Sequence, residues 1–314
     1  MRDDFARFAV LLGLIGCSAG APLPPQAVAL NNAGIEALAR GDLETADARF
    51  SVALEYSPRF VDALVNLGLV ELERGNFERA RISFERARRL NPDVAQPHHA
   101  LGVLAERNSR PDRASSHYYE ALRVDPGFAP SRANLARLLF ANGQTEEALV
   151  QFKRLVEVAP NDSSASAGLI ETLLRLGRTG EADQALGVAA ARFPDAPELA
   201  LLNARRELRL GHFDAACERL LPLATRHDEF GAAALGWLAT GELARGRPRY
   251  AVSAATAALA LTPESSVATY ALAVALTELR SPDAAVWLRR AQRLAPRDPL
   301  LARLGPALAR GREF

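Results

Sequence analysis

Three of the five histidines lie close together in the sequence and form the most obvious group of metal ligands. His98 and His99 are adjacent, and His117 follows in the next predicted helix. Imidazole nitrogens bind zinc, so two of these side chains could meet across a helical hairpin. Adjacent residues of a helix point about 100° apart, however, and no cysteine or acidic pattern completes a ligand set. We therefore expect no metal site and no other cofactor.

The motifs that carry most enzymatic chemistry are missing from the sequence. It contains no G-x-x-x-x-G-K phosphate loop, no H-E-x-x-H zinc pair and no G-x-S-x-G nucleophile turn. The 38 basic and 37 acidic residues nearly cancel, and no run of five like charges offers a surface for nucleic acid. We therefore expect a protein that is not an enzyme, with no small-molecule substrate and no nucleic-acid partner.

The two cysteines stand in different surroundings. Cys217 lies among apolar residues of a predicted helix, which is typical of a small buried side chain. Cys17 instead follows an apolar run over residues 8–16, which is preceded by Arg2 and Arg7. This run is too short to cross a bilayer as a helix, but it suits the core of a signal peptide.

The segment Leu14-Ile15-Gly16-Cys17 resembles the lipobox of bacterial lipoproteins. The resemblance implies that residues 1–16 are removed as a signal peptide and that Cys17 is acylated. Several acyl chains hold a protein on a membrane without a transmembrane helix. Ser18 resembles the residue that follows the cysteine in lipoproteins of the outer membrane rather than the inner membrane, which favours the periplasmic face of the outer membrane. The prolines within residues 17–26 predict a short, stiff tether.

Prolines, turn residues and alanines recur through the rest of the chain at intervals of 34 residues. The prolines are Pro58, Pro92, Pro126, Pro160 and Pro194, the turn residues are Gly41, Gly75, Ser109, Gly143, Gly177 and Gly211, and the alanines are Ala46, Ala80, Ala114, Ala148, Ala182 and Ala216. Between these markers, apolar residues follow helical spacing. Each period therefore predicts a helix, a turn, a second helix and a proline stop.

The second period shows how the two helices of a pair would pack. Gly68 in the first helix and Ala80 in the second lack bulk, so the helices can approach closely, and Phe84 fills the space between them. This pattern resembles the tetratricopeptide repeat, whose usual length is 34 residues. The resemblance implies an all-α fold, a right-handed α-solenoid of about eight helix-turn-helix repeats. We place the repeats at 27–60, 61–94, 95–128, 129–162, 163–196, 197–231, 232–265 and 266–298, with a capping helix at 299–314.

The sixth repeat departs from the pattern, because Pro222 falls inside its second helix. A proline there removes a backbone hydrogen bond and costs roughly 3 kcal/mol in a helix interior. We expect a kink or an early helix end near Pro222, which would separate repeats one to six (27–231) from repeats seven and eight (232–298). The alternative is a local irregularity without a joint.

In tetratricopeptide proteins the first helices of successive repeats line a concave groove that binds partners. By register, the resemblance assigns to this groove Asn31, Ile35, Val65, Leu69, His99, Val103, Arg107, Arg137, Glu171, Arg175, Arg205 and Arg209. The early positions are largely apolar and the later ones charged, which suggests an apolar pocket for a partner's hydrophobic stripe beside a basic patch for carboxylates. The alternative is that the arginines form only a solvated face.

These features together predict a lipid-anchored adaptor that binds partner proteins in the bacterial envelope. It resembles the pilotins of type IV pili, the lipoprotein scaffolds of exopolysaccharide export and the adaptors that recruit peptidoglycan-cutting enzymes. The sequence does not choose among a secretion, pilus or polysaccharide-export machine. The alternative is a soluble regulatory repeat protein with a cytoplasmic partner, in which the leader is no signal peptide.

Overall fold

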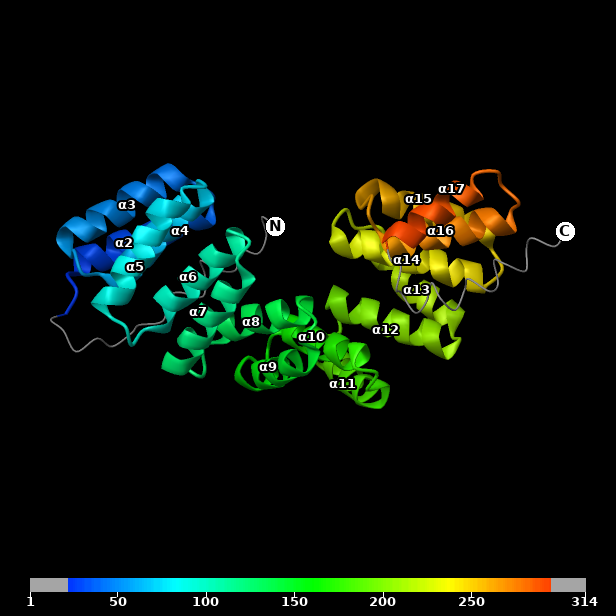
Figure 1. Ribbon diagram of the computed structural model, residues 1–314, viewed down its shortest axis with the longest axis horizontal. Helices are drawn as coiled ribbons and strands as arrows, with labels where there is room; N and C mark the ends of the chain where they lie inside the picture. Colours follow the sequence, from blue (N-terminus) through cyan, green and yellow to red (C-terminus); the bar gives the residue numbers. More distant parts are fainter. Residues whose placement is uncertain (1–21, 295–314) are drawn as a thin grey trace. The chain divides into compact units, whose positions relative to one another are not determined.

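The computed structural model describes residues 22–294, and over this range the regular secondary structure is helical, with sixteen helices and no strands (Figure 1). The predicted signal peptide, Cys17 and the predicted capping helix at 299–314 lie outside the described residues. The predicted all-α repeat fold is confirmed, since the helices follow one another in eight antiparallel pairs.

Each repeat contributes a first and a second helix. The first helices are α2 (Pro25–Ala39), α4 (Val61–Glu73), α6 (Ala95–Arg107), α8 (Ala129–Ala141), α10 (Ser163–Arg175), α12 (Pro197–Leu210), α14 (Glu229–Ala244) and α16 (Ser266–Glu278). The second helices are α3 (Leu43–Tyr56), α5 (Phe77–Leu90), α7 (Pro111–Val124), α9 (Thr145–Val158), α11 (Thr179–Arg192), α13 (Phe213–Ala224), α15 (Pro248–Leu261) and α17 (Ala284–Leu294). The two helices of each pair pack against each other along their length.

The turn inside each repeat depends on one residue with left-handed backbone geometry. Gly75 has φ +79° after α4, and the glycines at the same place in most other repeats take similar values. Such an angle costs glycine nothing, because glycine has no Cβ atom. In the third and eighth repeats the position is held by Ser109 (φ +54°) and Arg280 (φ +55°), for which the same geometry is strained.

The first and second helices approach closely where a glycine faces an aromatic ring. A Cβ atom placed on Gly68 would overlap the ring of Phe84, and Gly102 stands in the same relation to Tyr118. The Phe84 and Tyr118 side chains are fully buried. The close approach predicted from the glycine spacing is therefore confirmed in these repeats, and it is what allows a large ring to fill the centre of the hairpin.

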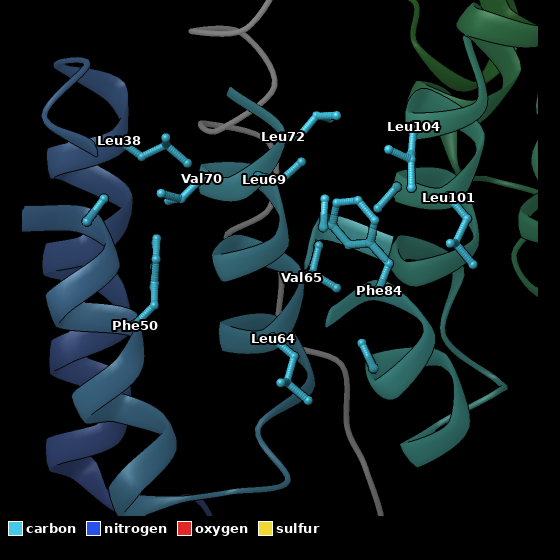
Figure 2. Close-up of a cluster of buried hydrophobic side chains, with 14 of the residues drawn as sticks. Leu38, Phe50, Leu64, Val65, Leu69, Val70, Leu72, Phe84, Leu101 and Leu104 are labelled. Atoms are coloured by element: carbon cyan, nitrogen blue, oxygen red, sulfur yellow. The ribbon is translucent and has the colours of Figure 1, made fainter. Parts of the chain in front are cut away.

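The chain divides into two compact units between Pro160 and Asn161, here called unit 1 and unit 2. Figure 2 shows the core of unit 1, in which side chains from α2 to α6 form one buried cluster around Phe50, Leu64 and Phe84. The core of unit 2 is built from smaller side chains, many of them alanines, with Trp237 and Trp287 packed at its margin. Successive repeats thus share a continuous core within each unit.

Helix α13 ends soon after Pro222, as expected from the proline. It spans 12 residues, whereas α11 and α15 each span 14. Packing nevertheless continues across this point, because α13 contacts both α12 and α14. Unit 2 therefore includes the sixth repeat together with the seventh.

Candidate partner-binding surface

The arginines assigned to the groove of unit 1 are ion-paired with the preceding repeat. Arg107 Nη2 lies 3.3 Å from Glu73 Oε1, and Arg137 Nη2 lies 2.5 Å from Glu106 Oε2. Each pair joins the first helix of one repeat to the first helix of the next. The arginine side chains are 42% and 59% exposed, so each pair adds at most about 1 kcal/mol. The pairs neutralise the predicted basic patch.

Ion pairs also join neighbouring repeats in unit 2, one between first helices and one between the second helix α11 and α12. Arg205 Nη1 lies 3.3 Å from Glu171 Oε1, and Arg209 Nη2 lies 2.6 Å from Asp183 Oδ1. The Arg205 guanidinium also stacks over the ring of Trp237, 5.1 Å from its centroid. Arg175 is exposed on α10. The two acid–arginine pairs again join one repeat to the next, so these arginines contribute to the contact between neighbouring repeats.

The acidic partners of these arginines were missed in the sequence, although a signal for them was present. Glu73 and Arg107 are 34 residues apart, as are Glu171 and Arg205. A separation of one repeat length puts two side chains at equivalent places on adjacent first helices. An acid and an arginine at that separation therefore predict an ion pair between repeats.

A polar network surrounds the Glu106 carboxylate in unit 1. Besides Arg137, Glu106 accepts a 2.6 Å hydrogen bond from the hydroxyl of Tyr118, and Asn134 donates to that hydroxyl at 3.2 Å. Burial, followed by the charge of Glu106, raises the pKa of Tyr118 above its ordinary value. The hydroxyl is therefore a permanent donor, and the network links α6, α7 and α8.

Several apolar positions assigned to the groove lie in the core instead. Val65 is 2% exposed and Leu69 is fully buried, and both belong to the cluster drawn in Figure 2. Ile35 and Val103 are half-buried and pack against the same cluster. Helix α4 has neighbours on both sides, α2 and α6, and the side chains between them become core. The expected apolar pocket is thus largely filled by the protein itself.

The polar residues expected among these apolar positions are also internal. Asn31 is 5% exposed and accepts a 3.0 Å hydrogen bond from Asn66, which joins α2 to α4. His99 Nδ1 lies 2.9 Å from Ser131 Oγ, and its ring packs between those of Tyr118 and Phe128. Complete burial lowers the pKa of His99 to about 3. The His99 imidazole is therefore neutral and acts in packing.

The other two histidines of the third repeat, His98 and His117, are also partly shielded from water. His98 Nε2 lies 3.3 Å from the carbonyl oxygen of Pro92, and burial lowers the pKa of both His98 and His117. Within residues 22–294 no three histidine, cysteine or acidic side chains are placed to hold a metal ion.

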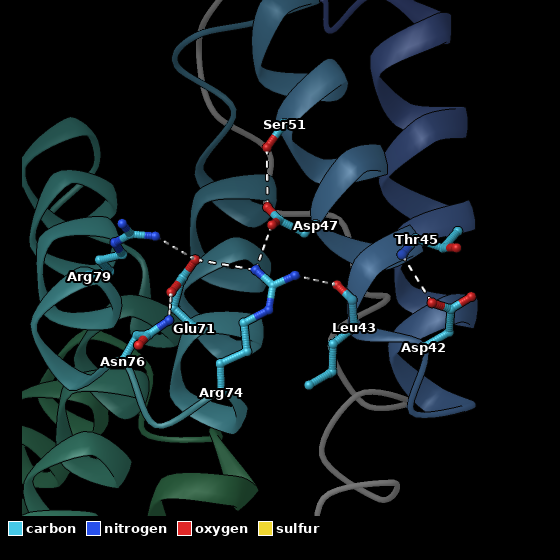
Figure 3. Close-up of polar contacts among 9 residues, drawn as sticks. All are labelled: Asp42, Leu43, Thr45, Asp47, Ser51, Glu71, Arg74, Asn76 and Arg79. Atoms are coloured by element: carbon cyan, nitrogen blue, oxygen red, sulfur yellow. Dashed lines mark hydrogen bonds and ion pairs between the residues drawn. The ribbon is translucent and has the colours of Figure 1, made fainter.

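Figure 3 shows a second polar network, which joins the first two repeats in unit 1. Arg74, at the end of α4, lies 2.5 Å from Asp47 on α3 and donates to the carbonyl oxygen of Leu43 at 3.2 Å. Glu71 is buried and accepts a 2.7 Å hydrogen bond from Asn76. None of these residues was among the predicted site residues. Because Arg74 is only 27% exposed, its contacts are better shielded from water than those of Arg107.

Asp62 in the first turn of α4 contrasts with all these paired charges. Its side chain is half-buried, and burial raises the pKa of its carboxyl group. Among the described parts of the chain nothing forms a hydrogen bond or an ion pair with it. Asp62 lies 34 residues after Val28, which is 37% exposed on α2. The Asp62 carboxylate therefore lacks a hydrogen-bond or ion-pair partner in the described chain, and it holds the place on α4 that exposed Val28 holds on α2.

A shallow hollow of about 570 Å³ lies in unit 2, where the turn before α13 meets the turn before α15. Arg245 and Arg247 line it together with His212 and Asp214. Arg245 is paired with Asp214 at 2.8 Å and with Glu242 at 2.8 Å. These acids neutralise the cationic wall of the hollow.

None of the sixteen described helices combines the length and apolar character needed to cross a membrane.

Comparison with protein families identifies the repeats. Two models described as "Tetratricopeptide repeat" match, one over residues 105–173 and the other over 31–95, 71–129 and 238–299. No curated protein matches the chain.

Solved structures share the fold. A tetratricopeptide repeat protein from Parabacteroides merdae is 17% identical, with 81% of this chain and 100% of that chain covered and a TM-score of 0.57. The pilF protein of Pseudomonas aeruginosa is 22% identical, with 70% and 96% covered and a TM-score of 0.57. The Cut9–Hcn1 tetramer of the APC/C is 17% identical, with 99% and 59% covered and a TM-score of 0.65.

Proposed function

The chain belongs to the tetratricopeptide repeat family, and from this premise we propose that it is a lipid-anchored adaptor that holds partner proteins in the bacterial envelope. Tetratricopeptide arrays serve protein–protein interaction. The observation that supports this role most directly is the unbroken series of helical pairs from Pro25 to Leu294, which leaves no separate catalytic fold within the described residues. Function then depends on the surfaces of the pairs.

The structure changes where the partner is expected to bind. The ion-paired arginines and the buried Val65 and Leu69 leave less of the assigned groove open than the sequence implied. The ends of the first helices in unit 1 still offer accessible groups, including Val28 on α2. We therefore place the first contact with a partner on α2 and α4.

The lipid anchor is the second part of the proposal. It is supported by the apolar run over residues 8–16, the lipobox-like segment that ends at Cys17 and the proline-rich residues that follow. An acylated Cys17 would hold the array near the outer membrane, on its periplasmic face, where it would assist assembly of a secretion, pilus or polysaccharide-export machine.

Metabolic labelling with palmitate tests the anchor. The native protein is expected to incorporate label and to partition into the detergent phase, and Cys17→Ala is expected to lose both properties. Cys217→Ala is the matched control, because Cys217 is buried in unit 2 and should leave labelling unchanged. Label that persists in Cys17→Ala would refute acylation of Cys17, and absence of label from the native protein would favour the soluble regulatory alternative.

Crosslinking in the native cell, followed by mass spectrometry of the captured proteins, tests the adaptor role. We expect specific envelope proteins to be recovered with the full chain. Recovery of the same proteins with a variant whose repeats are unfolded by paired Gly34→Leu and Gly68→Leu substitutions would contradict capture by the array, since those glycines face Phe50 and Phe84 without space for a side chain.

A further inference from the structure

Asn142 and Gly143 lie in the turn between α8 and α9, and they are the only asparagine–glycine pair in the sequence. Such a pair is reactive because glycine has no side chain to keep its backbone nitrogen away from the amide carbon of the asparagine. Both residues are exposed, and a Cβ atom added to Gly143 would meet nothing within 4 Å. Water therefore has free access to the pair.

The reaction open to this pair is deamidation of the asparagine. The Gly143 nitrogen gives up its proton and bonds to the side-chain carbon Cγ of Asn142, the bond from Cγ to the amide nitrogen breaks, and ammonia leaves with that proton. Water then opens the resulting five-membered succinimide at either carbonyl, which yields aspartate or isoaspartate. The reaction consumes only water, so the conformation of the turn sets its rate.

The folded turn keeps the two reacting atoms apart. Asn142 has ψ 0°, so the Gly143 nitrogen eclipses the backbone nitrogen of Asn142 and is turned away from its side chain. The Gly143 N–H also donates to the carbonyl oxygen of Phe140 at 3.2 Å, and the Gly143 carbonyl oxygen accepts from the Thr145 hydroxyl at 3.3 Å. Ring closure requires ψ of Asn142 to rotate, which breaks the hydrogen bond to Phe140.

We propose that Asn142 is a latent deamidation site, closed while the turn is folded and converted when the turn opens. Local opening of a surface turn costs less free energy than unfolding of the whole chain, so conversion accumulates in protein that is otherwise folded. The product carries a carboxylate at the C-terminal end of α8, where the helix dipole disfavours negative charge, and isoaspartate also lengthens the main chain by one atom. Conversion therefore loosens the turn of the fourth repeat.

The turn between α6 and α7 provides an internal reference. Asn108 precedes Ser109 with similar backbone geometry, φ −88° and ψ 12°, and the Ser109 N–H donates to the carbonyl oxygen of Glu106 at 2.9 Å. Serine, unlike glycine, carries a Cβ atom that hinders the approach of its nitrogen to the asparagine side chain. Asn108 should therefore convert more slowly than Asn142 in the same molecules.

Mass spectrometry of the incubated chain tests the inference. The full chain is kept in mildly alkaline buffer, digested with trypsin and examined for the mass gain that accompanies replacement of an amide by an acid. Trypsin cuts after Arg137 and Lys153, so the pair is recovered on residues 138–153, and a synthetic peptide of that sequence gives the rate without a fold. We expect Asn142 to convert at least about tenfold more slowly in the folded chain than in the peptide, because the turn must open first. Asn142→Gln should remove the signal from this position.

Two cavity variants decide whether opening of the fourth repeat controls conversion. Leu139→Ala truncates a side chain of α8 that is 3% exposed, and Leu202→Ala truncates an equally buried one on α12 in unit 2. Leu139→Ala should speed conversion of Asn142 about tenfold, because the cavity weakens the packing that keeps the turn closed. Leu202→Ala should leave the rate unchanged. If circular dichroism shows that Leu139→Ala is unfolded, the native chain in urea below its unfolding midpoint takes its place and should show the same acceleration.

Three results would overturn the inference. They are equal rates in the folded chain and the peptide, equal acceleration by Leu139→Ala and Leu202→Ala, and no conversion of Asn142 under any folded condition, urea below the midpoint included. The effect on the repeat is measured with Asn142→Asp, which reproduces the aspartate product. It should unfold at a lower urea concentration than Asn142→Gln, and equal midpoints would refute the loosening of the turn.

Discussion

Ser109 adopts, with φ +54°, the left-handed turn geometry that Gly75 adopts with φ +79° one repeat earlier. The two residues are 34 positions apart and follow equivalent first helices, α6 and α4. This conformation is sterically strained for serine but not for glycine, because the serine Cβ atom comes close to the following carbonyl oxygen in this region of φ.

Ser109→Gly is expected to stabilise the protein by about 1 kcal/mol, since it relieves this strain. Gly75→Ser should destabilise it by a similar amount. Urea unfolding followed by circular dichroism measures both changes. Equal midpoints for Ser109→Gly and the native chain would show that the turn after α6 carries no strain.

Gly68→Ala is expected to destabilise unit 1 by about 1–3 kcal/mol, because the added methyl group overlaps the buried ring of Phe84. Gly187→Ala on α11 is the matched control. A Cβ atom there meets nothing within 4 Å, and alanine is the better helix former, so a gain of about 0.5–1 kcal/mol is expected. Thermal unfolding of the two variants should shift in opposite directions.

Arg107→Glu should weaken the junction between repeats two and three by up to about 1 kcal/mol, because it places two carboxylates together in the position of the Glu73–Arg107 pair. The double variant Glu73→Arg with Arg107→Glu should recover part of that loss. Raising the salt concentration should shrink both effects. A double variant no more stable than Arg107→Glu would show that the pair contributes nothing.

Asp62→Asn is expected to stabilise the protein at neutral pH. Burial raises the pKa of Asp62 in the folded chain. The free energy of unfolding therefore falls as pH rises through the folded-state pKa and Asp62 ionises. Below the ordinary value of 3.8 the carboxyl is protonated in both states, and the variant and native chain should converge. Urea midpoints across this range measure the difference.

His99 should make the fold sensitive to acid. Its pKa falls from 6.5 to about 3 on folding, so protons bind the unfolded state first and stability is lost as pH falls through this interval. The loss from this group approaches about 1.4 kcal/mol per pH unit below its ordinary pKa. His99→Gln should flatten the dependence, whereas the same change at exposed His227 should not.

The repeat fold could be predicted because its determinants are local and periodic. The turn residue and the alanine recur at fixed places along the chain, and in the early repeats the structure brings Gly34 against Phe50 and Gly68 against Phe84 as the spacing indicated. The leader, Cys17 and the capping helix remain predictions, because they lie outside the described residues.

The partner-binding surface was harder to predict, because register gives the direction of a side chain but not its neighbours. Register placed Leu69 on the groove, but α2 and α6 enclose α4 and bury it. Register also identified Arg137 as a positively charged groove residue. It did not identify the counter-ion, Glu106, because that residue lies in the preceding repeat. Asp62 was overlooked because its significance is the absence of a partner, which no spacing reveals.

In the first three hairpins the contact between a glycine and a ring is completed within the hairpin, as Gly34 with Phe50, Gly68 with Phe84 and Gly102 with Tyr118 show. Duplication or deletion of one whole repeat in the gene would therefore add or remove a complete hairpin without disrupting such a contact. The number of hairpins can then change during evolution by whole repeats. The length of the array would change, whereas the contacts that fold each remaining hairpin would not.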